Sequence, residues 1–231
     1  MKSSAHPAAL ETTEIRRHYH VQPYATLVLD GGYEEAGDQG RFQVRAGDVL
    51  LHPAFSAHRD RVGRTRTFVL DLPLPMEGRS WPGLARLVDP DLVIRVAAVD
   101  AREAQSLLVE GLTRVVVERS DPADRLADAL SVDPSTQIGG WAANNGFSRE
   151  WLSRRFKRLF GVDSAMFRVE ARARLAWRQI VATEQPLAQI AVACGFADQS
   201  HMTRAIGRLT GRSPRLWRPV TLVQEGDRDS R

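Results

Sequence analysis

The 231-residue chain is poor in cysteine and lysine, with one cysteine, Cys194, and two lysines, Lys2 and Lys157. One thiol cannot form an intrachain disulfide, which excludes the disulfide-stabilised class of small secreted domains. We expect Cys194 to be a small buried residue. No segment approaches the ~18 consecutive apolar residues of a membrane span, and the N-terminus has no apolar stretch typical of a secretory signal. The sequence therefore predicts a cytoplasmic protein without a membrane anchor.

The composition is that of a globular protein, and the positive charge is concentrated in its C-terminal part. Hydrophobic residues make up 43% and charged residues 26%, which excludes a disordered or collagen-like chain. Residues 135–218 contain fourteen Lys and Arg against five Asp and Glu, whereas residues 1–120 are nearly balanced. Concentrated arginine fits a polyanionic partner, because a guanidinium group can donate two hydrogen bonds to a phosphate or a guanine edge. Taken alone, this excess is equally typical of a solvated helical face.

The N-terminal part has the alternating polarity of β-strands. Between residues 18 and 74, turn residues such as Gly, Asp and Pro separate the segments YATLVLD, GRFQVRAGDVLLH and TFVLDLP. This alternation and the spacing of the turns predict a small barrel or sandwich.

Residues 100–116 have helical periodicity instead. Leu108, Leu112 and Val115 recur at i, i+4 and i+7, and Asp100 is a suitable N-cap. We expect this apolar stripe to pack on the β-domain, and a dimerisation helix is the alternative.

The chain after Ser120 favours helices throughout. We expect them near residues 123–130, 138–144, 148–160, 164–181, 187–194 and 199–210. The fold class is therefore α+β. We predict a sensing or dimerisation domain at residues 1–98, a connecting helix and linker at 99–122, an all-α domain at 123–220 and a flexible tail at 221–231.

The helical half contains an internal duplication. Ala142, Gly146 and Phe147 recur 49 residues later, at Ala191, Gly195 and Phe196. Further matches lie 50 residues apart and pair Leu152, Arg154, Phe156 and Gly161 with Met202, Arg204, Ile206 and Gly211. The shared unit is a short helix, a glycine turn, a second helix and a closing glycine, which describes a helix-turn-helix at about 138–160 and another at about 187–210.

The second helix of each copy is amphipathic. The predicted buried stripes are Leu152, Phe156, Leu159 and Phe160 in the first copy and Met202, Ile206 and Leu209 in the second. The opposite faces carry Arg149, Ser153, Arg154 and Lys157, and then His201, Arg204 and Arg208. Any amphipathic helix has a polar face, but two arginine-bearing faces at matched positions favour insertion into DNA major grooves.

The helix between the copies sets their separation. Residues 164–181 would span about 27 Å at 1.5 Å per residue. Such a linker helix can hold two recognition helices about one DNA turn, ~34 Å, apart. One chain could then contact two adjacent major-groove segments without dimerising.

The helical half resembles the AraC/XylS family of bacterial transcriptional regulators. Residues 186–218 match the second helix-turn-helix signature of that family at Ile190-Ala191, Gly195-Phe196, Asp198-Gln199-Ser200-His201, Arg204, Gly211, Pro214 and Arg218. Residues 147–161 are similar to its first recognition helix, so the resemblance covers residues 123–220. It implies contacts to double-stranded DNA bases by Glu150, Ser153, Arg154, Gln199, Ser200, His201 and Arg204, and phosphate contacts by Arg149, Lys157 and Arg208. It also implies an activator that contacts RNA polymerase, although the sequence leaves activation and repression open.

Three departures from the family pattern concern the target sequence more than the activity. Gly139 and Gly140 lie inside the first short helix, each costing about 1 kcal/mol relative to Ala, so we expect a looser or later start. Met202 and Ile206 stand where the family usually has Phe. Glu150 on a recognition face repels phosphate but can accept a hydrogen bond from cytosine N4.

The β-rich half resembles the cupin superfamily, in which clustered histidines bind a divalent metal ion inside a small β-barrel. The matching segments are His18-Tyr19-His20, with both imidazoles on one strand face, and residues 47–58. The resemblance places His18, His20 and His58 at metal-ligand positions and Tyr24 where the family has a carboxylate. Three histidines suit Zn²⁺ or another borderline metal, and a degenerate cupin with structural or pocket-lining histidines is the alternative. His52 is a secondary candidate because Pro53 interrupts any regular strand there.

These features together predict a sequence-specific DNA-binding regulator. An unknown small molecule or metal ion in the cupin-like barrel would change the geometry of a homodimer or release the DNA-binding half. The alternative is a metal-dependent cupin enzyme fused to a DNA-binding domain, which needs an open metal site and an acid or base; Glu34 and Glu35, in an expected turn, support it poorly. A nonspecific architectural binder is a third interpretation, against which the asymmetric recognition faces argue.

Overall fold

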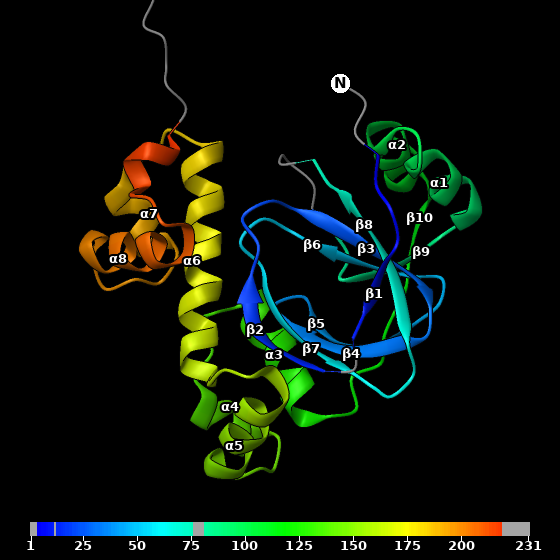
Figure 1. The fold of residues 1–231 in the computed structure, drawn as a ribbon. Coiled ribbons are helices and arrows are strands. Elements are labelled where there is room, and N and C mark those ends of the chain that lie inside the picture. Colours follow the sequence, from blue (N-terminus) through cyan, green and yellow to red (C-terminus); the bar gives the residue numbers. More distant parts are fainter. Residues whose placement is uncertain (1–3, 12, 76–80, 219–231) are drawn as a thin grey trace, which may run out of the picture. The chain divides into compact units, whose positions relative to one another are not determined.

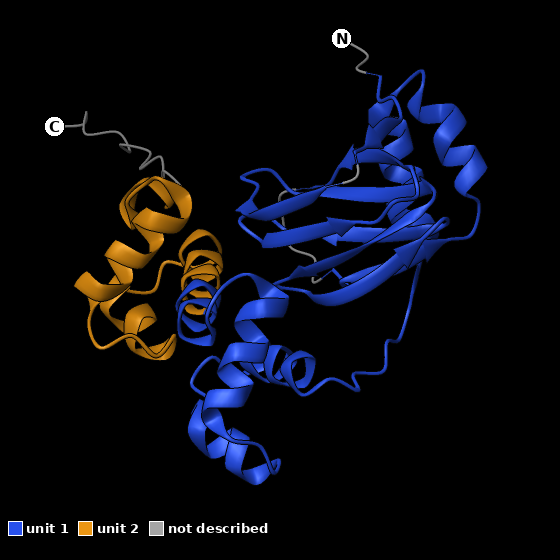
Figure 2. Ribbon diagram, turned by 60° about the horizontal axis from the view of Figure 1, so that its bottom comes forward, with its two compact units in different colours: residues 1–171 blue, residues 172–231 orange. Residues whose placement is uncertain are grey.

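The computed structural model describes residues 4–11, 13–75 and 81–218. The chain forms two compact units, residues 1–171 and residues 172–231 (Figure 2). This division falls within helix α6 (Ser164–Ala182), whereas the sequence predicted a domain boundary at 122/123, because the first helix-turn-helix packs against the β-sheets of unit 1. The tail predicted at 221–231 lies outside the described residues. None of the described helices is long and apolar enough to cross a membrane.

Ten strands of unit 1 form two sheets (Figure 1). The six-stranded sheet has the order β1 (Ala8–Leu10), β8 (Thr67–Pro73), β3 (Tyr24–Asp30), β6 (Asp48–His52), β9 (Leu84–Leu87) and β10 (Leu112–Arg114). The four-stranded sheet has the order β2 (Glu14–Tyr19), β7 (Ala57–Val62), β4 (Gly32–Gly37) and β5 (Gly40–Arg45). Among the described strands none belongs to both sheets, so the region is a sandwich. The closed cupin-like barrel that we expected is not formed, because the six-stranded sheet ends in the three-residue strands β1 and β10 and neither pairs with the other sheet.

Alternating side chains of the six-stranded sheet supply two cores. Leu27, Leu51 and Leu70 point to one face, where they pack with residues of α1 (Pro90–Ala97) and α2 (Ala101–Gly111). Their neighbours Val28 and Leu50 point to the other face and pack with residues of the four-stranded sheet. Each of these side chains is almost fully buried, which is worth ~1.5–3 kcal/mol apiece. The strand period of two therefore fixes the six-stranded sheet between a helical layer and the second sheet.

The helix expected at 100–116 packs on the β-domain, and it is shorter than predicted. Its N-cap Asp100 accepts hydrogen bonds from the N–H groups of Arg102 and Glu103, and Leu108 is fully buried in the sheet-facing core. The helix stops at Gly111, and Leu112–Arg114 continue as β10, which pairs with β9. Part of the segment predicted as a linker thus completes the six-stranded sheet.

The remaining helices lie close to their predicted positions. They are α3 (Pro122–Val132), α4 (Ile138–Asn144), α5 (Arg149–Phe160), α6, α7 (Leu187–Ala193) and α8 (Gln199–Thr210), and the 3-10 helix η1 (Pro214–Trp217), which was not predicted, follows them. Gly139 and Gly140 do not delay the start of α4, although its N-cap position, Gln137, makes no side-chain capping bond. Helices α3 to α5 belong to unit 1, and α7, α8 and η1 belong to unit 2.

Candidate DNA-binding surface and histidine cluster

The first recognition helix, α5, is fixed at both ends and along one face. The Ser148 side chain accepts a hydrogen bond from the N–H of Trp151 at 3.2 Å, which caps the N-terminus. Gly161 closes the helix in the left-handed conformation at φ 71°, where glycine is favoured. The buried face packs Phe156 and Phe160 in a stack with centroids 4.5 Å apart. Of the predicted contact residues, Arg149, Glu150, Arg154 and Lys157 are exposed and Ser153 is half-buried.

The second recognition helix, α8, repeats this construction in unit 2. Asp198 accepts a hydrogen bond from the N–H of His201 at 2.6 Å, and Gly211 ends the helix at φ 69°. Met202 and Ile206 are fully buried, so these aliphatic residues fill the positions where the family usually has Phe. Gln199, Ser200, Arg204 and Arg208 are exposed. His201, by contrast, is half-buried. Its ring packs edge-to-face on Phe196, with centroids 5.3 Å apart, and this contact covers part of the side chain.

The duplication seen in the sequence extends to backbone geometry. Gly146 and Gly195, at the two turns, have φ values of 75° and 73°. In each copy the N–H of the following phenylalanine donates to the carbonyl of the buried alanine at 2.9 Å, from Phe147 to Ala142 and from Phe196 to Ala191. The chain therefore contains two separately built helix-turn-helix units of the same design.

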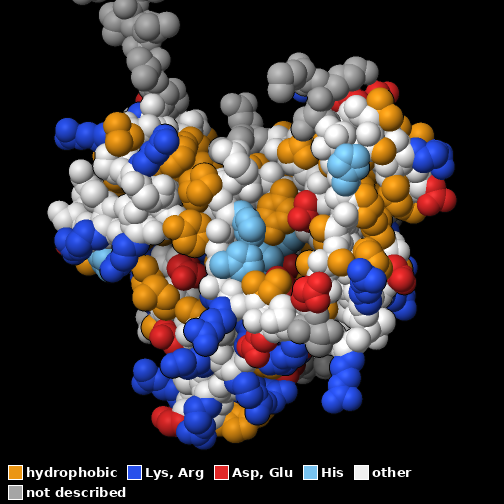
Figure 3. Space-filling model, viewed as in Figure 1, with side chains coloured by type: hydrophobic (Ala, Val, Ile, Leu, Met, Phe, Trp, Pro, Cys, Tyr) orange, Lys and Arg blue, Asp and Glu red, His pale blue; other side chains and the backbone are white. Residues whose placement is uncertain are grey.

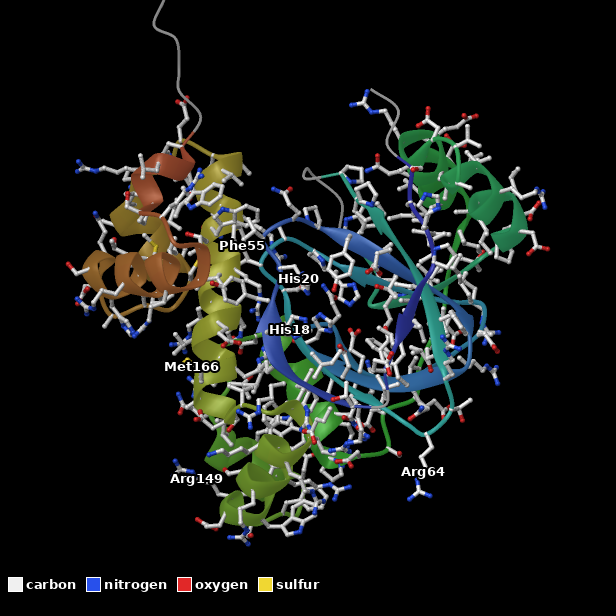
Figure 4. The ribbon with its side chains drawn as sticks, viewed as in Figure 1. His18, His20, Phe55, Arg64, Arg149 and Met166 are labelled. Atoms are coloured by element: carbon white, nitrogen blue, oxygen red, sulfur yellow. The ribbon has the colours of Figure 1, made fainter. Side chains whose placement is uncertain are left out.

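The histidines that the sequence singled out lie together in unit 1. His18 and His58 are cross-strand partners in the β2–β7 pair, and their ring centroids lie 4.4 Å apart. The His20 ring centroid lies 4.8 Å from that of His18 and 5.5 Å from that of His58. Each ring has a nitrogen within 4.8 Å of a nitrogen of the other two. Histidine side chains form a patch on the surface that Figure 3 shows, and Figure 4 labels His18 and His20.

Behind this outer set, between the two sheets, lies a buried group that the sequence analysis missed. His52 Nε2 lies 3.0 Å from Glu35 Oε2, and His58 Nδ1 lies 3.3 Å from the same oxygen and 3.0 Å from Asp60 Oδ1. The sequence predicted Glu35 in a turn, but it lies on β4, with 3% of its surface exposed. His52 is the last residue of β6, so Pro53 follows the strand and does not interrupt it. The segment GYEEAG has no clear alternation of polarity and is flanked by glycines, so the sequence held no strong signal for a strand at Glu35.

Comparison with known proteins agrees with the two helix-turn-helix units. A family model of a helix-turn-helix domain matches residues 141–219, which include both recognition helices and the helix between them. The chain is also 23% identical over 219 residues to the uncharacterized HTH-type transcriptional regulator YobQ of Bacillus subtilis (strain 168), with 87% of this chain and 88% of that protein covered. Residues 141–219 are therefore a helix-turn-helix domain of the AraC type, and the chain is similar over most of its length to an HTH-type transcriptional regulator.

Two solved structures show further similarity to this chain. The C-terminal domain of AraT, a response regulator from Geobacillus stearothermophilus, is 22% identical, with 48% of this chain and 94% of that chain covered and a TM-score of 0.41. ToxT from Vibrio cholerae is 9% identical, with 93% and 98% covered and a TM-score of 0.43.

Ionisation in the histidine cluster follows from burial and charge. Burial by itself would lower the pKa of His58, but the carboxylates of Glu35 and Asp60 raise it to about 10. Burial opposes ionisation of Glu35 too, yet His52 and His58 lower its pKa well below the usual range. The pKa of His20 falls to about 4, through burial and then repulsion by the neighbouring imidazoles. At pH 7 the cluster therefore contains a neutral His20 and an ion pair between His58 and Glu35.

Tyr24 occupies the position where the cupin resemblance predicts a carboxylate. Its hydroxyl lies 3.1 Å from His58 Nε2, and its ring stacks on His52 with centroids 4.3 Å apart. Tyr24 and His20 also line a pocket of about 480 Å³, together with Val21, Gln22, Pro23, Asp71, Leu72 and Pro73. This volume is within the range of small-molecule sites, and most of the lining is apolar.

The outer face of the four-stranded sheet holds the first helix-turn-helix of the regulator. Arg59 donates to the carbonyl of Arg158 at 2.6 Å, at the C-terminal end of α5, where the helix dipole favours a cation. Arg41 forms two hydrogen bonds with Asp124 of α3, at 2.8 and 2.7 Å. Arg17 binds Glu170 of α6 at 2.7 Å. The sequence analysis predicted none of these contacts between the β-domain and the helices.

One arginine of α5 faces the protein and not the solvent side of the helix. The Arg155 guanidinium forms hydrogen bonds with the carboxylate of Asp121, with its Nε 2.9 Å from Oδ1. Asp121 also caps α3 by accepting from the N–H of Ala123. The Arg155–Asp121 pair thus joins helix α5 to the N-terminus of α3. Arg154 and Lys157, on the same helix, remain exposed.

Proposed function

We propose that this regulator reads two adjacent major-groove segments of one DNA, the first with α5 and the second with α8. The observation that carries the proposal is the repetition of one capped, amphipathic recognition helix with an exposed basic face in each unit. Each unit supplies one such helix, and helix α6, 19 residues long, connects the two helix-turn-helix units along the chain. Lys and Arg side chains gather over α4 and α5 in the view of Figure 3.

The contacts divide into two groups by chemistry. Arg154 and Arg204 are the proposed bidentate base readers, because a guanidinium fork matches guanine O6 and N7. Glu150, Ser153, Gln199, Ser200 and His201 are the other proposed base contacts. Arg149, Lys157 and Arg208 would bind phosphates, which adds affinity and salt dependence without sequence preference.

The experiment that tests this function is selection of binding sites by the purified full-length protein from a random duplex pool at a fixed near-physiological salt concentration. We expect enrichment of two short motifs about one helical turn apart. Retention of DNA without an enriched sequence would contradict the proposal and support nonspecific architectural binding.

The β-sandwich is the proposed sensor, with a small molecule in the pocket or a metal ion at the histidines as its signal. His18, His20 and His58 are the metal ligands that the cupin resemblance implies, and the cluster brings their nitrogens together. The strands connect signal and response, because the residues next to cluster residues dock the helices: Arg17 beside His18, and Arg59 beside His58. A change in the cluster would shift the population of the docked arrangement and hence the affinity for DNA.

Partner proteins complete the proposal. As an activator in the cytoplasm the regulator would contact RNA polymerase. A homodimer would form through the β-domain, where Val88, Leu92 and Val99 are exposed around α1. Sedimentation of the full-length protein with and without a metal ion tests the dimer.

A metal-dependent enzyme is the second candidate, because Glu35, His52 and His58 form the two-histidine, one-carboxylate set used by oxygen-activating iron enzymes. Each of these residues has at most 5% of its surface exposed, and the pocket is lined by other residues. A catalytic metal needs an open position for substrate. This arrangement favours a sensor over an enzyme, and metal analysis with turnover assays distinguishes them.

A further inference from the structure

The buried inner group has the donor atoms and spacing of a metal site in its own right. We propose that Glu35, His52 and His58 Nδ1 form an inner binding site for a divalent transition metal ion such as Zn²⁺, which shares only His58 with the outer set of three histidines. This inference rests on the sensing role proposed above and assigns the signal ion to the inner donors instead of the three outer histidines. Carboxylate and imidazole together are a common ligand set for such ions.

Two distances within the inner group are close to those between ligands of one ion, and all three donor atoms lie within 4.8 Å of one another. Glu35 Oε2 lies 3.0 Å from His52 Nε2 and 3.3 Å from His58 Nδ1. Ligand atoms bound to Zn²⁺ at ~2.0–2.1 Å in a tetrahedron are ~3.3–3.4 Å from each other. The carboxylate oxygen is therefore already placed between two imidazole nitrogens at a spacing that one ion could bridge. Asp60 Oδ1, 3.0 Å from the same His58 nitrogen, is the nearest further donor.

The charge of the inner group also suits a dication. Glu35 and Asp60 bring two carboxylates into a region where neither exceeds 6% exposure. Buried carboxylates are stable only when paired or bound to a metal, and a divalent ion bound by these donors would neutralise the charge of both carboxylates.

The surrounding residues give the inner site support and a route to solvent. The Tyr24 ring stacks on His52, and its hydroxyl lies 3.1 Å from His58 Nε2, as expected of a residue that orients a metal-bound imidazole. His18 and His20 are half-buried, between the inner group and the surface. The outer set contains three imidazoles, and its nitrogens lie nearer to solvent. We therefore assign tight binding to the inner donors and access to His18 and His20.

Metal titration of the full-length protein tests this assignment. The protein would be stripped with a chelator and titrated with Co²⁺, whose visible absorption reports the ligand geometry, and with Zn²⁺ in competition. The inner variants are Glu35→Gln and His52→Asn, and the outer variant is His18→Ala. Glu34→Gln is the matched control, because Glu34 is the adjacent residue on β4 and binds Arg41 on the opposite face. Circular dichroism verifies that each variant folds.

We expect one tightly bound ion per chain, at least a tenfold loss of affinity in either inner variant, and less than a threefold change for His18→Ala and Glu34→Gln. Absence of tight binding to the wild type would overturn the inference, and so would a tenfold loss for His18→Ala. Because Glu35→Gln places an amide in a charged site, a variant that fails to fold would be replaced by His52→Asn for the decision. The DNA selection experiment does not depend on these titrations. A protein that does not select a DNA sequence can therefore be distinguished from one that does not bind metal at the inner site.

Discussion

His58 and Arg59 are consecutive residues of β7, and their side chains lie on opposite faces of the four-stranded sheet. The His58 imidazole lies 3.0 Å from Asp60 inside the sandwich, whereas the Arg59 guanidinium donates to the Arg158 carbonyl of α5 at 2.6 Å. Adjacent residues of a strand must point to opposite sides. The histidine cluster and helix α5 thus contact consecutive residues of the same strand.

This relationship predicts that Arg59 stabilises the C-terminal end of α5. Replacement by alanine leaves the Arg158 carbonyl without its cationic donor, so Arg59→Ala should speed amide hydrogen exchange in the last turn of α5. Arg61→Ala, on the same strand, is the control because the Arg61 side chain is 50% exposed. Equal exchange in α5 for wild type and Arg59→Ala would show that the contact does not hold the helix.

Arg41 should contribute more to stability than other arginines of its strand. Its loss leaves Asp124, which is 7% exposed, without its two-hydrogen-bond partner, and an unsatisfied buried group costs ~1–3 kcal/mol. We expect Arg41→Ala to lower the free energy of unfolding in urea by that amount. Arg45→Ala, an exposed position of β5, should change it by less than ~0.5 kcal/mol. Similar values for the two variants would contradict the proposed docking.

Two glycine-to-alanine substitutions in the helix-turn-helix units should change the free energy of unfolding in opposite directions. Gly146 has φ 75° and open space where a Cβ would lie, so Gly146→Ala meets only backbone strain of ~1–2 kcal/mol. Gly207 lies inside α8 with similar open space and an ordinary helical φ, so Gly207→Ala should stabilise by ~0.5–1 kcal/mol. Thermal unfolding of both variants measures the difference. Destabilisation by Gly207→Ala would mean that the packing around α8 is tighter than described.

Low pH should weaken the Arg155–Asp121 ion pair that connects α5 to the N-terminus of α3. Burial favours the neutral form of Asp121, but the hydrogen bonds from Arg155 and from Ala123 N–H lower its pKa below the ordinary 3.8. A lowered carboxyl pKa contributes stability that is fully present above the ordinary value and is lost as pH falls through the folded-state value. The stability difference between wild type and Arg155→Met should therefore be constant above about pH 5 and shrink below about pH 4. A difference independent of pH would show that Arg155 acts through packing alone.

The sequence predicted the local elements better than their partners. The bounds of β3, β8, α4 and α8 follow directly from alternation, helical period and caps, because these signals lie within the elements themselves. The end of α2 was overestimated, since Leu112 continues the helical apolar stripe and only its pairing with Leu87 makes it a strand residue. Strand pairing is a contact between distant segments, and periodicity does not encode it.

The residues of the histidine cluster also differ in how far the sequence predicts them. The three outer histidines could be grouped from sequence because a resemblance specified their spacing. Glu35 and His52 lie on strands of different sheets and meet only because the two sheets pack face to face. The docking arginines, Arg41 and Arg59, were indistinguishable in sequence from exposed ones. Duplicated helices were readable because each unit repeats within a single segment of the chain.

The central claim is that each recognition helix reads its own DNA segment. On the site obtained by selection, discrimination against single base-pair changes would be measured for the wild type, Arg154→Ala, Arg204→Ala and the exposed control Arg102→Ala of α2. We predict that Arg154→Ala loses ~1–3 kcal/mol of discrimination in one motif only and that Arg204→Ala loses it in the other, while Arg102→Ala matches the wild type. Equal weakening on all sequences, or effects of both variants in the same motif, would contradict the account.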